Sequence, residues 1–367
     1  MQVHVVGAGP AGLMAAEFLA QGGAQVAIID HHVNPARKFL LAGRGGLNLT
    51  HSEPLEKLLT RYGDGRRFLE QAIRDFPPSS VIAWCEGLGI KTFVGSSGRV
   101  FPACLKASPV MRAWLKRLGE LGVTLQSKTS WTGLDEVPTI LALGGASWPE
   151  LGSDAAWVAQ FEANGIKVNP LVPSNGRQLV QWTEHFSSRH AGQPLKNVAV
   201  TVGAKTLRGE VMIARDGIEG GAIYGLSQAF RSTGATELRL DLKPDLTEAE
   251  LVTRMSWPRG KESRSNFWRK RFGLSPTAIS LMHEFKATSP KAIIIPTTGQ
   301  ADIRRAISSA GGVAMEEVNE NFRLHKFPNT YVVGEMLDWD APTGGYLMQT
   351  CFSTAVRAAK ALLQNHK

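Results

Sequence analysis

The first thirty residues constrain the fold more than any other part of the chain. An apolar segment at residues 3–6 leads through a glycine-rich turn into strong helix formers at residues 13–20. A second apolar segment, residues 26–29, then ends at Asp30. Strand, G-x-G-x-x-G, helix, strand and acid together form the βαβ fingerprint of dinucleotide binding. The pattern predicts a site for the ADP part of a cofactor; the alternative is a tight βα turn in some other α/β protein.

Each residue of this fingerprint has a physical role. Gly7 allows the tight turn, Gly9 lets the backbone approach a pyrophosphate, and Gly12 lets the helix pack close to the strand. Pro10 suits the first helical position, where its missing N–H costs nothing. The helix N-terminus offers free N–H groups and a partial positive charge to phosphates. Asp30 would accept hydrogen bonds from a ribose, and its charge would repel a 2′-phosphate.

Length and composition are those of an ordinary globular protein. The chain has 367 residues, 43% of them hydrophobic, which allows two or three domains. No basic segment precedes the first strand, and no uncharged run reaches the roughly 18 residues of a membrane span. The cysteines, Cys85, Cys104 and Cys351, are far apart and form no C-x-x-C, which argues against a redox disulfide or a metal site. We expect a cytoplasmic protein without bound metal.

The net charge of +9 is unevenly distributed. Residues 1–160 carry 15 Lys and Arg against 13 Asp and Glu, and residues 327–367 carry 3 against 3. Residues 161–326 carry 23 against 16, which gives them +7. A positive field in the middle of the chain would attract an anionic partner.

The pattern of apolar residues changes along the chain and predicts a divided cofactor domain. Residues 171–242 and 292–318 are rich in short strands, and residues 246–288 are helical in pattern. Buried-strand patterns recur at residues 139–143 and 331–333, and a helix follows the latter. We therefore predict an α/β fold in which residues 1–160 and 327–367 form a discontinuous cofactor domain and residues 161–326 form an insert, the probable substrate domain.

Five further segments resemble motifs of the BaiN/RdsA-type family of NAD(P)/FAD-dependent oxidoreductases. They are KFLLAGRGGLNLTH (38–51), GRVFP (98–102), LALGGASWPELGS (141–153), AISSAGGV (306–313) and GEMLDWDAPTGGYLMQ (334–349). The resemblance implies FAD, a Rossmann domain of the two-dinucleotide-fold (glutathione-reductase-like) type, and an insert with a β-barrel-like and a helical part.

The resemblance also implies which residues hold the cofactor. Residues 43–50 would lie along the flavin, and Val123 would meet the adenine through its backbone. Glu335 stands where related flavoproteins place an aspartate for the ribityl or pyrophosphate region. The backbone of Gly344–Tyr346, at the start of the last helix, would stabilise negative charge on reduced flavin. The complete expected set is Gly7, Gly9, Pro10, Ala11, Gly12, Asp30, Lys38, Gly43, Asn48, Val123, Gly144, Gly334, Glu335, Gly344, Gly345 and Tyr346.

The chain departs from the family pattern at two places. Most of the family has Arg-Cys where this chain has Gly46–Leu47, and Tyr-Asn where it has Tyr346–Leu347. The chain is therefore similar to a divergent subgroup. Activities in the wider family include reduction of carbon–carbon double bonds, in steroid-like acids or in uridine of ribosomal RNA, and oxidation of small amines.

Catalytic groups are weakly indicated. No second G-x-G-x-x-G is present, so NAD(P)H as electron donor would dock transiently on the flavin. Proton donors or acceptors could be Tyr346, Arg99, Lys106 or Cys104, each of which could equally be structural. His51 is more simply a local hydrogen-bonding residue.

Residues 254–271 combine seven basic residues, one acid and three aromatics. Basic groups for phosphates and rings for unstacked bases are one way to bind single-stranded RNA. The alternatives are a solvated helix with inward-packed aromatics, or another anionic ligand. The residues concerned are Arg254, Arg259, Lys261, Arg264, Trp268, Arg269, Lys270 and Arg271.

Three functions follow from these patterns. The first is an FAD-dependent reductase of a carbon–carbon double bond in an anionic substrate, with uridine in RNA as the sharpest version. The second is an FAD-dependent oxidase of a small amine. The third is a non-enzymatic flavin- or RNA-binding module.

Overall fold

The chain forms two compact units. The computed structural model describes residues 1–42, 45–134 and 136–366. The first unit contains residues 1–172 and 308–367, and the second contains residues 173–307. Both ends of the chain thus belong to one unit, which the rest of the chain interrupts.

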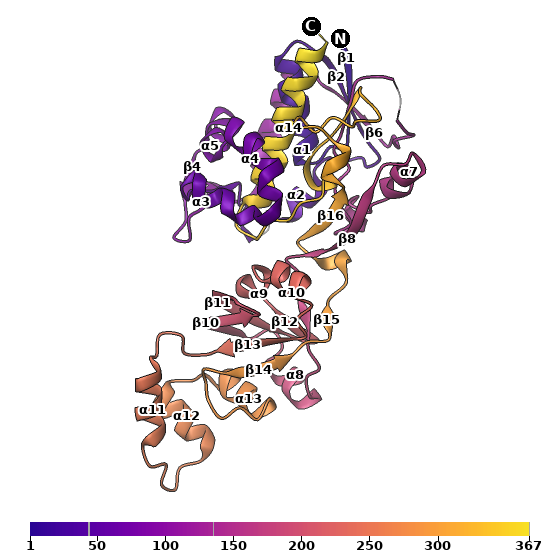
Figure 1. Cartoon of the computed structure of the whole chain (residues 1–367). Helices are drawn as coiled ribbons and strands as arrows, with labels where there is room; N and C mark the ends of the chain where they lie inside the picture. The colour runs from indigo at the N-terminus through magenta and orange to yellow at the C-terminus, as the bar shows by residue number, and fades with distance from the viewer. Residues whose placement is uncertain (43–44, 135, 367) are drawn as a thin grey trace. The chain divides into compact units, whose positions relative to one another are not determined.

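The first unit is built on a five-stranded parallel sheet (Figure 1). In spatial order its strands are β17 (Thr330–Val332), β7 (Thr139–Leu141), β1 (Gln2–Val6), β2 (Gln25–Asp30) and β6 (Thr124–Ser127). The central residue Val5 pairs with Ile28 on one side and Ile140 on the other, and all three are buried. Strands that are buried on both faces require continuous apolar runs. For this reason the buried strands could be predicted from the sequence. The predicted α/β class with a Rossmann-type sheet is confirmed.

Helices accompany this sheet. They are α1 (Pro10–Gln21), α2 (Arg37–Ala42), α3 (Leu55–Leu59), α4 (Arg66–Asp75), α5 (Pro78–Gly87), α6 (Ala107–Glu120), α7 (Trp157–Ala163) and α14 (Tyr346–Asn365). Helix α14 packs along α1 and α4, and the two chain termini lie at the same end of the unit (Figure 1). Glu17 of α1 is fully buried and accepts hydrogen bonds from Trp84 Nε1 at 3.0 Å, Trp114 Nε1 at 2.7 Å and Arg117 at 2.9 Å. These donors compensate the burial of its charge.

Two small sheets complete the first unit. One contains β3 (Thr50–His51), β5 (Arg99–Pro102) and β4 (Thr92–Val94), and the other pairs β16 (Ser308–Val313) with β8 (Val168–Ser174). A Cβ on Gly311 would lie 2.1 Å from the Pro170 carbonyl oxygen, so β16 approaches β8 closely only because that residue is glycine. The predicted domain junctions, at 160/161 and 326/327, fall inside the first unit because β8 and β16 pair there.

The second unit contains a seven-stranded sheet that curls back on itself. In order its strands are β14 (Ile293–Pro296), β13 (Glu237–Asp241), β10 (Pro194–Val202), β11 (Lys205–Ala214), β12 (Gly217–Glu219), β9 (Gln178–Leu179) and β15 (Gly299–Gln300). The two edge strands, β14 and β15, are joined by a short turn. Within it, Thr297 N donates to Thr236 O at 2.7 Å and Thr298 N donates to Leu179 O at 3.0 Å. The turn therefore contacts both edges, which gives the sheet its barrel-like closure.

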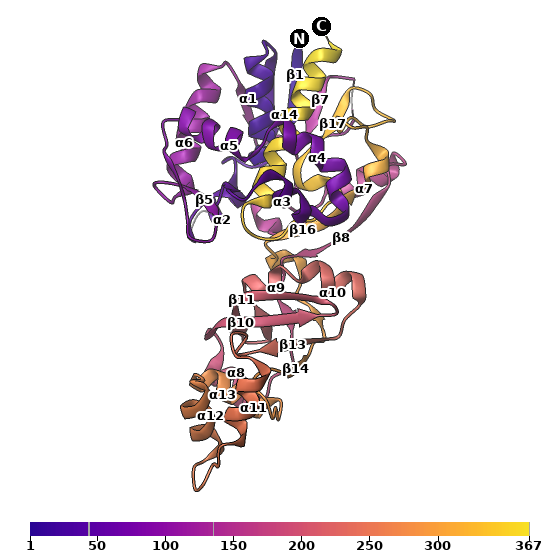
Figure 2. The ribbon, with the colours of Figure 1, turned by 60° about the vertical axis from the view of Figure 1, so that its left-hand side comes forward.

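Six helices accompany this sheet. They are α8 (Glu184–His190), α9 (Gly221–Tyr224), α10 (Ser227–Thr233), α11 (Glu248–Ser256), α12 (Arg264–Phe272) and α13 (Pro276–Glu284). Within this unit α9 and α10 lie on one side of the strands and α11 to α13 on the other, as the two views agree (Figure 1, Figure 2). The predicted helical segment 246–288 corresponds to α11, α12 and α13.

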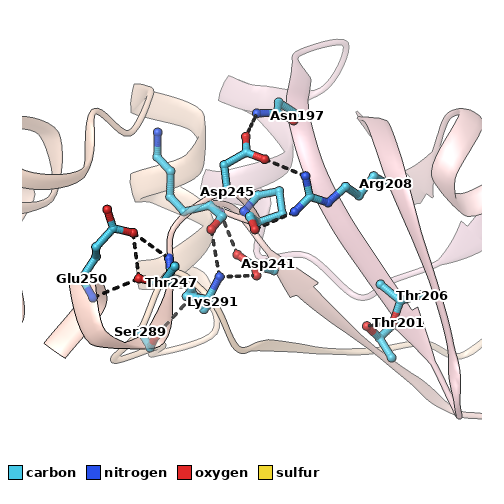
Figure 3. Close-up of polar contacts among 12 residues, drawn as sticks. Asn197, Thr201, Thr206, Arg208, Asp241, Asp245, Thr247, Glu250, Ser289 and Lys291 are labelled. Carbon is cyan, nitrogen blue, oxygen red and sulfur yellow. Dashed lines mark hydrogen bonds and ion pairs between the residues drawn. The ribbon is translucent and has the colours of Figure 1, made fainter. Parts of the chain in front are cut away.

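A polar network fixes the start of the helical part to the strands (Figure 3). Lys291 Nζ donates to Asp241 at 2.8 Å and to the Lys243 carbonyl oxygen at 2.9 Å. Thr247 and Glu250 form a capping box at the start of α11, with Thr247 N donating to Glu250 at 2.9 Å. Helix α11 is thus held where it leaves β13.

Candidate cofactor site

A pocket lies at the carboxyl ends of the parallel strands of the first unit. The turns after β1, β2 and β7 and the turn after β17 all reach it, because parallel strands end at the same edge of a sheet. The predicted residues among those that line it are Gly7, Gly9, Pro10, Ala11, Asp30, Lys38, Gly144 and Glu335. The structure therefore brings together residues from both ends of the chain.

The three fingerprint glycines have different surroundings. A Cβ on Gly7 would lie 2.4 Å from the Ala142 carbonyl oxygen, and one on Gly12 would lie 1.9 Å from the Gly7 carbonyl oxygen. Both are glycines because the protein itself leaves no room. A Cβ on Gly9 would have no neighbour within 4 Å, although Gly9 lines the pocket. No packing contact of the protein demands glycine there, which fits a ligand that approaches the backbone.

The start of α1 supplies donors to the same pocket. Leu13 N donates to Gly9 O at 2.9 Å, which closes the first turn of the helix. The N–H groups of Ala11 and Gly12 precede that turn and have no partner within the helix. Such groups, with the helix dipole behind them, suit a pyrophosphate.

Asp30 is held by backbone donors. Its carboxylate accepts from Ala8 N at 2.7 Å and from His32 N at 2.8 Å, one on each oxygen. A carboxylate has about four acceptor positions, so hydrogen bonds from a ribose remain possible. These contacts orient the carboxylate toward the pocket that it lines.

Lys38 and Glu335 form an ion pair across 297 residues of sequence. Lys38 Nζ lies 2.8 Å from Glu335 Oε2, and it also donates to Ser147. Glu335 accepts from Ser309 N at 2.8 Å, so the motif at 306–313 reaches the pocket through this residue. The carboxylate therefore has a lysine and a backbone donor beside it, and both charged side chains line the pocket.

Five residues that follow β2 also line the pocket and were not identified from the sequence: His31, His32, Asn34, Ala36 and Arg37. The rings of His31 and His32 lie with centroids 4.1 Å apart, and Arg37 donates to the His32 ring at 2.9 Å. Burial, with the neighbouring His31 and Arg37, lowers the pKa of His32 below its usual value. All three line the pocket beside Asp30. The only available signal was their position directly after the acidic end of β2.

Val123 lies away from this pocket. Strand β6 runs parallel to β2, with Thr124 opposite Ala27 and Ser127 opposite Asp30. Val123 precedes Thr124 and is therefore at the amino end of the sheet. Backbone near Asp30 comes instead from Thr129, whose N–H donates to Asp30 O at 3.0 Å. The expected contact of Val123 with adenine does not fit this register.

The segment expected to lie along the flavin is partly described. Gly43 falls outside the described residues. Asn48 Oδ1 is a buried acceptor without a hydrogen-bond partner in the described part of the chain. A buried acceptor without a donor is costly, so it indicates a missing partner. The flavin ring carries one imide N–H, a donor of the right kind.

The N-terminus of α14 packs against the same segment. A Cβ on Gly345 would lie 2.6 Å from the Thr50 carbonyl group, and Gly345 has a φ of 99°. Gly344 has a φ of 130°, and its Cβ would meet the Tyr346 ring at 2.9 Å. Both glycines are needed for this turn, which brings the first helical N–H groups of a 20-residue helix to β3. Gly334, with a φ of 71°, lets β17 end against Ala11 of α1.

Tyr346 belongs to a buried polar cluster that the sequence did not predict. Its hydroxyl donates to Glu53 at 2.7 Å, and Arg61 donates to both Glu53 oxygens at 2.9 and 2.6 Å. The His51 ring stacks on the Tyr346 ring at 5.2 Å. Burial and the Glu53 charge hold the pKa of Tyr346 well above its usual value. Burial alone would raise the pKa of Glu53, but the hydrogen bonds from Arg61 and Tyr346 lower it.

Within the described ranges, no side-chain hydrogen bond or ion pair joins the other catalytic candidates to this cluster. Arg99 lies on β5, opposite His51 in the register. Lys106 is exposed and precedes α6. Cys104 is exposed, and its thiol donates to the Lys106 carbonyl oxygen at 3.5 Å. Cys351, which lines the pocket, is buried, and burial raises the pKa of its thiol to about 12.

The basic run of residues 254–271 spans α11, α12 and the loop between them. Its aromatic residues differ in exposure: Trp257 is 45% exposed, whereas Trp268 is 2% exposed and packs with Phe267 and Phe272. The expectation that Trp268 stacks on a base is therefore wrong, because its ring is in the core of the second unit. Lys270 pairs with Glu262 at 2.6 Å.

The sequence matches a known family over almost its whole length. Residues 1–361 match the family described as HI0933-like protein Rossmann domain. The chain is 24% identical to a 3-dehydro-bile acid delta(4,6)-reductase of Clostridium scindens, over 98% of each protein. It is also 24% identical to a ribosomal RNA dihydrouridine synthase of Escherichia coli K12, over 98% of this chain and 97% of that protein. These matches confirm the family resemblance that the motifs indicated.

Solved structures agree on the fold. A 3-ketosteroid-delta4-(5alpha)-dehydrogenase from Rhodococcus jostii RHA1 aligns with a TM-score of 0.50 over 98% of this chain and 96% of that one, at 14% identity. In the described part of the chain, no helix has the length and apolar character of a membrane span.

Proposed function

The chain belongs to the HI0933-like Rossmann-domain family and is an FAD-dependent oxidoreductase; on this premise we propose that it reduces a carbon–carbon double bond in an anionic substrate, with uridine in RNA as the specific case. NAD(P)H is the proposed electron donor. Because the chain is an oxidoreductase of this family, the third predicted function, a non-enzymatic flavin- or RNA-binding module, is not proposed.

The observation that supports an anionic substrate is the difference in net charge between the two units. Residues 173–307 hold 20 Lys and Arg against 12 Asp and Glu, a net +8. The remaining residues hold 21 against 20, a net +1. A positive field of this kind raises the local concentration of an anionic substrate.

The names of two relatives support the reaction type. One is a delta(4,6)-reductase and the other a dihydrouridine synthase. Dihydrouridine differs from uridine by two hydrogens added across one carbon–carbon double bond. The carbon skeletons of the two substrates are unrelated, so the shared chemistry is the part that we transfer to this chain.

The residues of the first unit have separate roles in this proposal. Gly9 and the first N–H groups of α1 would receive the pyrophosphate, and Asp30 would bind the ribose. Asn48 would accept the imide N–H, and the start of α14 would stabilise negative charge on the ring. Bound FAD would supply hydride transfer.

The Tyr346 cluster would set the polarity at the start of α14. The Tyr346 hydroxyl keeps its proton at neutral pH, because burial and Glu53 both oppose its ionisation. Arg61 in turn keeps Glu53 ionised. Tyr346 thus remains a neutral hydrogen-bonding group, and it is a stronger candidate for orienting a ligand than for giving up a proton.

The test is the visible absorbance of the purified protein. We expect an oxidised flavin spectrum that NADH or NADPH bleaches without oxygen. Uridine-containing RNA should then restore the spectrum, with two hydrogens gained per uridine by mass spectrometry. RNA in which dihydrouridine replaces uridine is the matched control and should restore nothing.

A different outcome would favour the amine oxidase. If a small amine bleaches the flavin and air restores it with peroxide release, while NAD(P)H has no effect, the proposed reductase is wrong. The Gly9→Val variant controls for reactions that need no bound cofactor, because its pocket should not accept the pyrophosphate.

A further inference from the structure

We propose that single-stranded RNA binds to the exposed surface formed by α11, the 257–262 loop and α12, with Trp257 as the base-stacking ring; this rests on RNA being the substrate of the proposed function. The surface is called here the Trp257 surface. It consists of Val252, Met255, Trp257, Arg259, Lys261, Arg264, Arg269 and Arg271.

Trp257 is held in place although it is exposed. The Arg271 guanidinium lies 5.1 Å from the centre of the Trp257 ring and 5.8 Å from that of the buried Phe267 ring. Arg254 donates to the Arg271 carbonyl oxygen at 3.2 Å, which ties α11 to the end of α12. A ring with a cation over one face and 45% of the residue exposed can stack a base on its other face.

Apolar side chains on α11 accompany this ring. Val252 is 66% exposed and Met255 is 39% exposed. They are three residues apart on one helix, so they lie on the same face. Trp257 is the C-cap residue of the same helix. Exposed apolar groups on the helix that ends at this ring would provide contact area for the faces of unstacked bases, whereas a purely solvated helix would carry polar residues here.

The charges of this surface are available to phosphates. Only one acid occurs in residues 254–271, Glu262, and it pairs with Lys270. Across the described ranges, the other six basic side chains of the run form no ion pair within 4.0 Å, and four of them, Arg259, Lys261, Arg264 and Arg269, are exposed. Unpaired surface cations next to an aromatic ring match the groove of single-strand binding proteins.

The packing of α12 explains why Trp257, and not Trp268, is the proposed stacking ring. Phe267, Trp268 and Phe272 face the core, where Trp268 and Phe272 have ring centres 5.1 Å apart. Their burial fixes the opposite face of α12 toward solvent. Arg264 and Arg269 therefore remain outside, and Trp257, which follows α11, is the one exposed tryptophan of the run.

The experiment measures binding of a labelled oligouridine of about 12 nucleotides, a length within the site size of single-strand modules, to the FAD-loaded full chain. Trp257→Ala should weaken binding about 5- to 150-fold, the effect of losing one stacked base. Trp257→Phe should retain most of the affinity. Since Trp257 is exposed, neither variant should alter the flavin spectrum or the unfolding midpoint.

Charge is tested by two matched triple variants. Replacing Arg259, Lys261 and Arg264 with Ala should reduce the slope of log affinity against log salt by about 2, because each phosphate contact contributes about 0.7. Replacing Lys196, Lys205 and Arg239, three exposed basic residues elsewhere in the second unit, should leave the slope unchanged. Equal losses in both variants would mean general attraction to polyanions and would overturn the proposal.

Other outcomes separate this surface from the proposed function. If Trp257→Ala reduces uridine in RNA with unchanged KM, the surface is wrong and the function stands. If oligouridine binds through Trp257 but no RNA is ever reduced, the surface stands and the substrate is wrong. If Trp257→Ala loses binding to anionic lipid vesicles but not to oligouridine, the partner is a membrane and the proposal fails.

Discussion

The cofactor pocket and the Trp257 surface are built from different materials. The pocket combines glycines, a helix N-terminus and strand ends with a few charged side chains, among them Asp30, Lys38 and Glu335, in a unit of net charge +1. The Trp257 surface is made of long side chains in a unit of net charge +8. A site formed by a local backbone turn can be recognised from consecutive residues in the sequence. A surface formed by side chains depends instead on which face of each helix is exposed.

The difference shows in how well each region could be predicted. Eight of the expected cofactor residues line one pocket. Five of them, Gly7, Gly9, Pro10, Ala11 and Asp30, belong to the fingerprint, which dictates a local turn. Lys38, Gly144 and Glu335 were expected from the family motifs. In the basic run, Trp257 and Trp268 are equivalent in the sequence. Packing alone made one exposed and the other buried.

The largest expected effect contrasts two glycines of the fingerprint, Gly12 and Gly9. Gly12→Val places a side chain 1.9 Å from the Gly7 carbonyl oxygen, and should lower the free energy of unfolding by about 4 kcal/mol or more. Gly9→Val meets open space and should cost less than about 1 kcal/mol, yet lose FAD. Urea unfolding of the cofactor-free proteins, with FAD content after purification, measures both. Equal destabilisation would contradict a ligand-determined role for Gly9.

The next effect concerns the two tryptophans. Trp268→Ala should cost about 3–5 kcal/mol of unfolding free energy, since the ring is 2% exposed and contacts Phe267 and Phe272. Trp257→Ala should cost less than about 1 kcal/mol. Thermal or urea unfolding of the two single variants gives the comparison. A large loss for Trp257→Ala would mean that this ring is structural and would remove the contrast on which the Trp257 surface depends.

A third prediction concerns the Tyr346 cluster, a part of the first unit in which the hydrogen bonds join side chains to one another. Glu53→Gln should lower the free energy of unfolding by about 2 kcal/mol at pH 7, because hydrogen bonds to an ionised group are lost. The folded-state pKa of Glu53 is lowered, so its stabilisation is fully present above the unfolded value of 4.5 and is lost as pH falls through the folded value.

The difference between wild type and Glu53→Gln should therefore be constant above about pH 5 and shrink below it. Unfolding midpoints measured across this range test the sign. Glu56→Gln, at an exposed residue of α3 three positions further along the chain, is the matched control. A difference that grows toward low pH would show that Glu53 is not ionised in the folded protein.

The smallest effect concerns the position of α11. Thr247→Ala removes the capping box shown in Figure 3 and should cost about 1 kcal/mol. If α11 carries part of the Trp257 surface, the same change should weaken oligouridine binding slightly while leaving FAD content unchanged. Thr253→Ala, in the same helix but outside the cap, should have a smaller effect on stability.

The βαβ fingerprint, the family and the α/β class could all be predicted from the amino-acid sequence. These follow from local preferences: glycines at positions that only glycine can occupy, and apolar runs that only a doubly covered strand requires. The positions of Gly7, Gly12 and Asp30 were therefore readable without any knowledge of the rest of the chain.

The contacts between distant segments, by contrast, became known only from the folded chain. Tyr346 and Glu53 are 293 residues apart, and no sequence pattern around either residue predicts their hydrogen bond. Val123 lies away from the site because of the register between β6 and β2. That register depends on how the two strands are aligned, which the residue type at one position does not reveal. The exposure of Trp257 likewise depends on which face of α12 entered the core, because burial is a property of the packed chain and not of the residue.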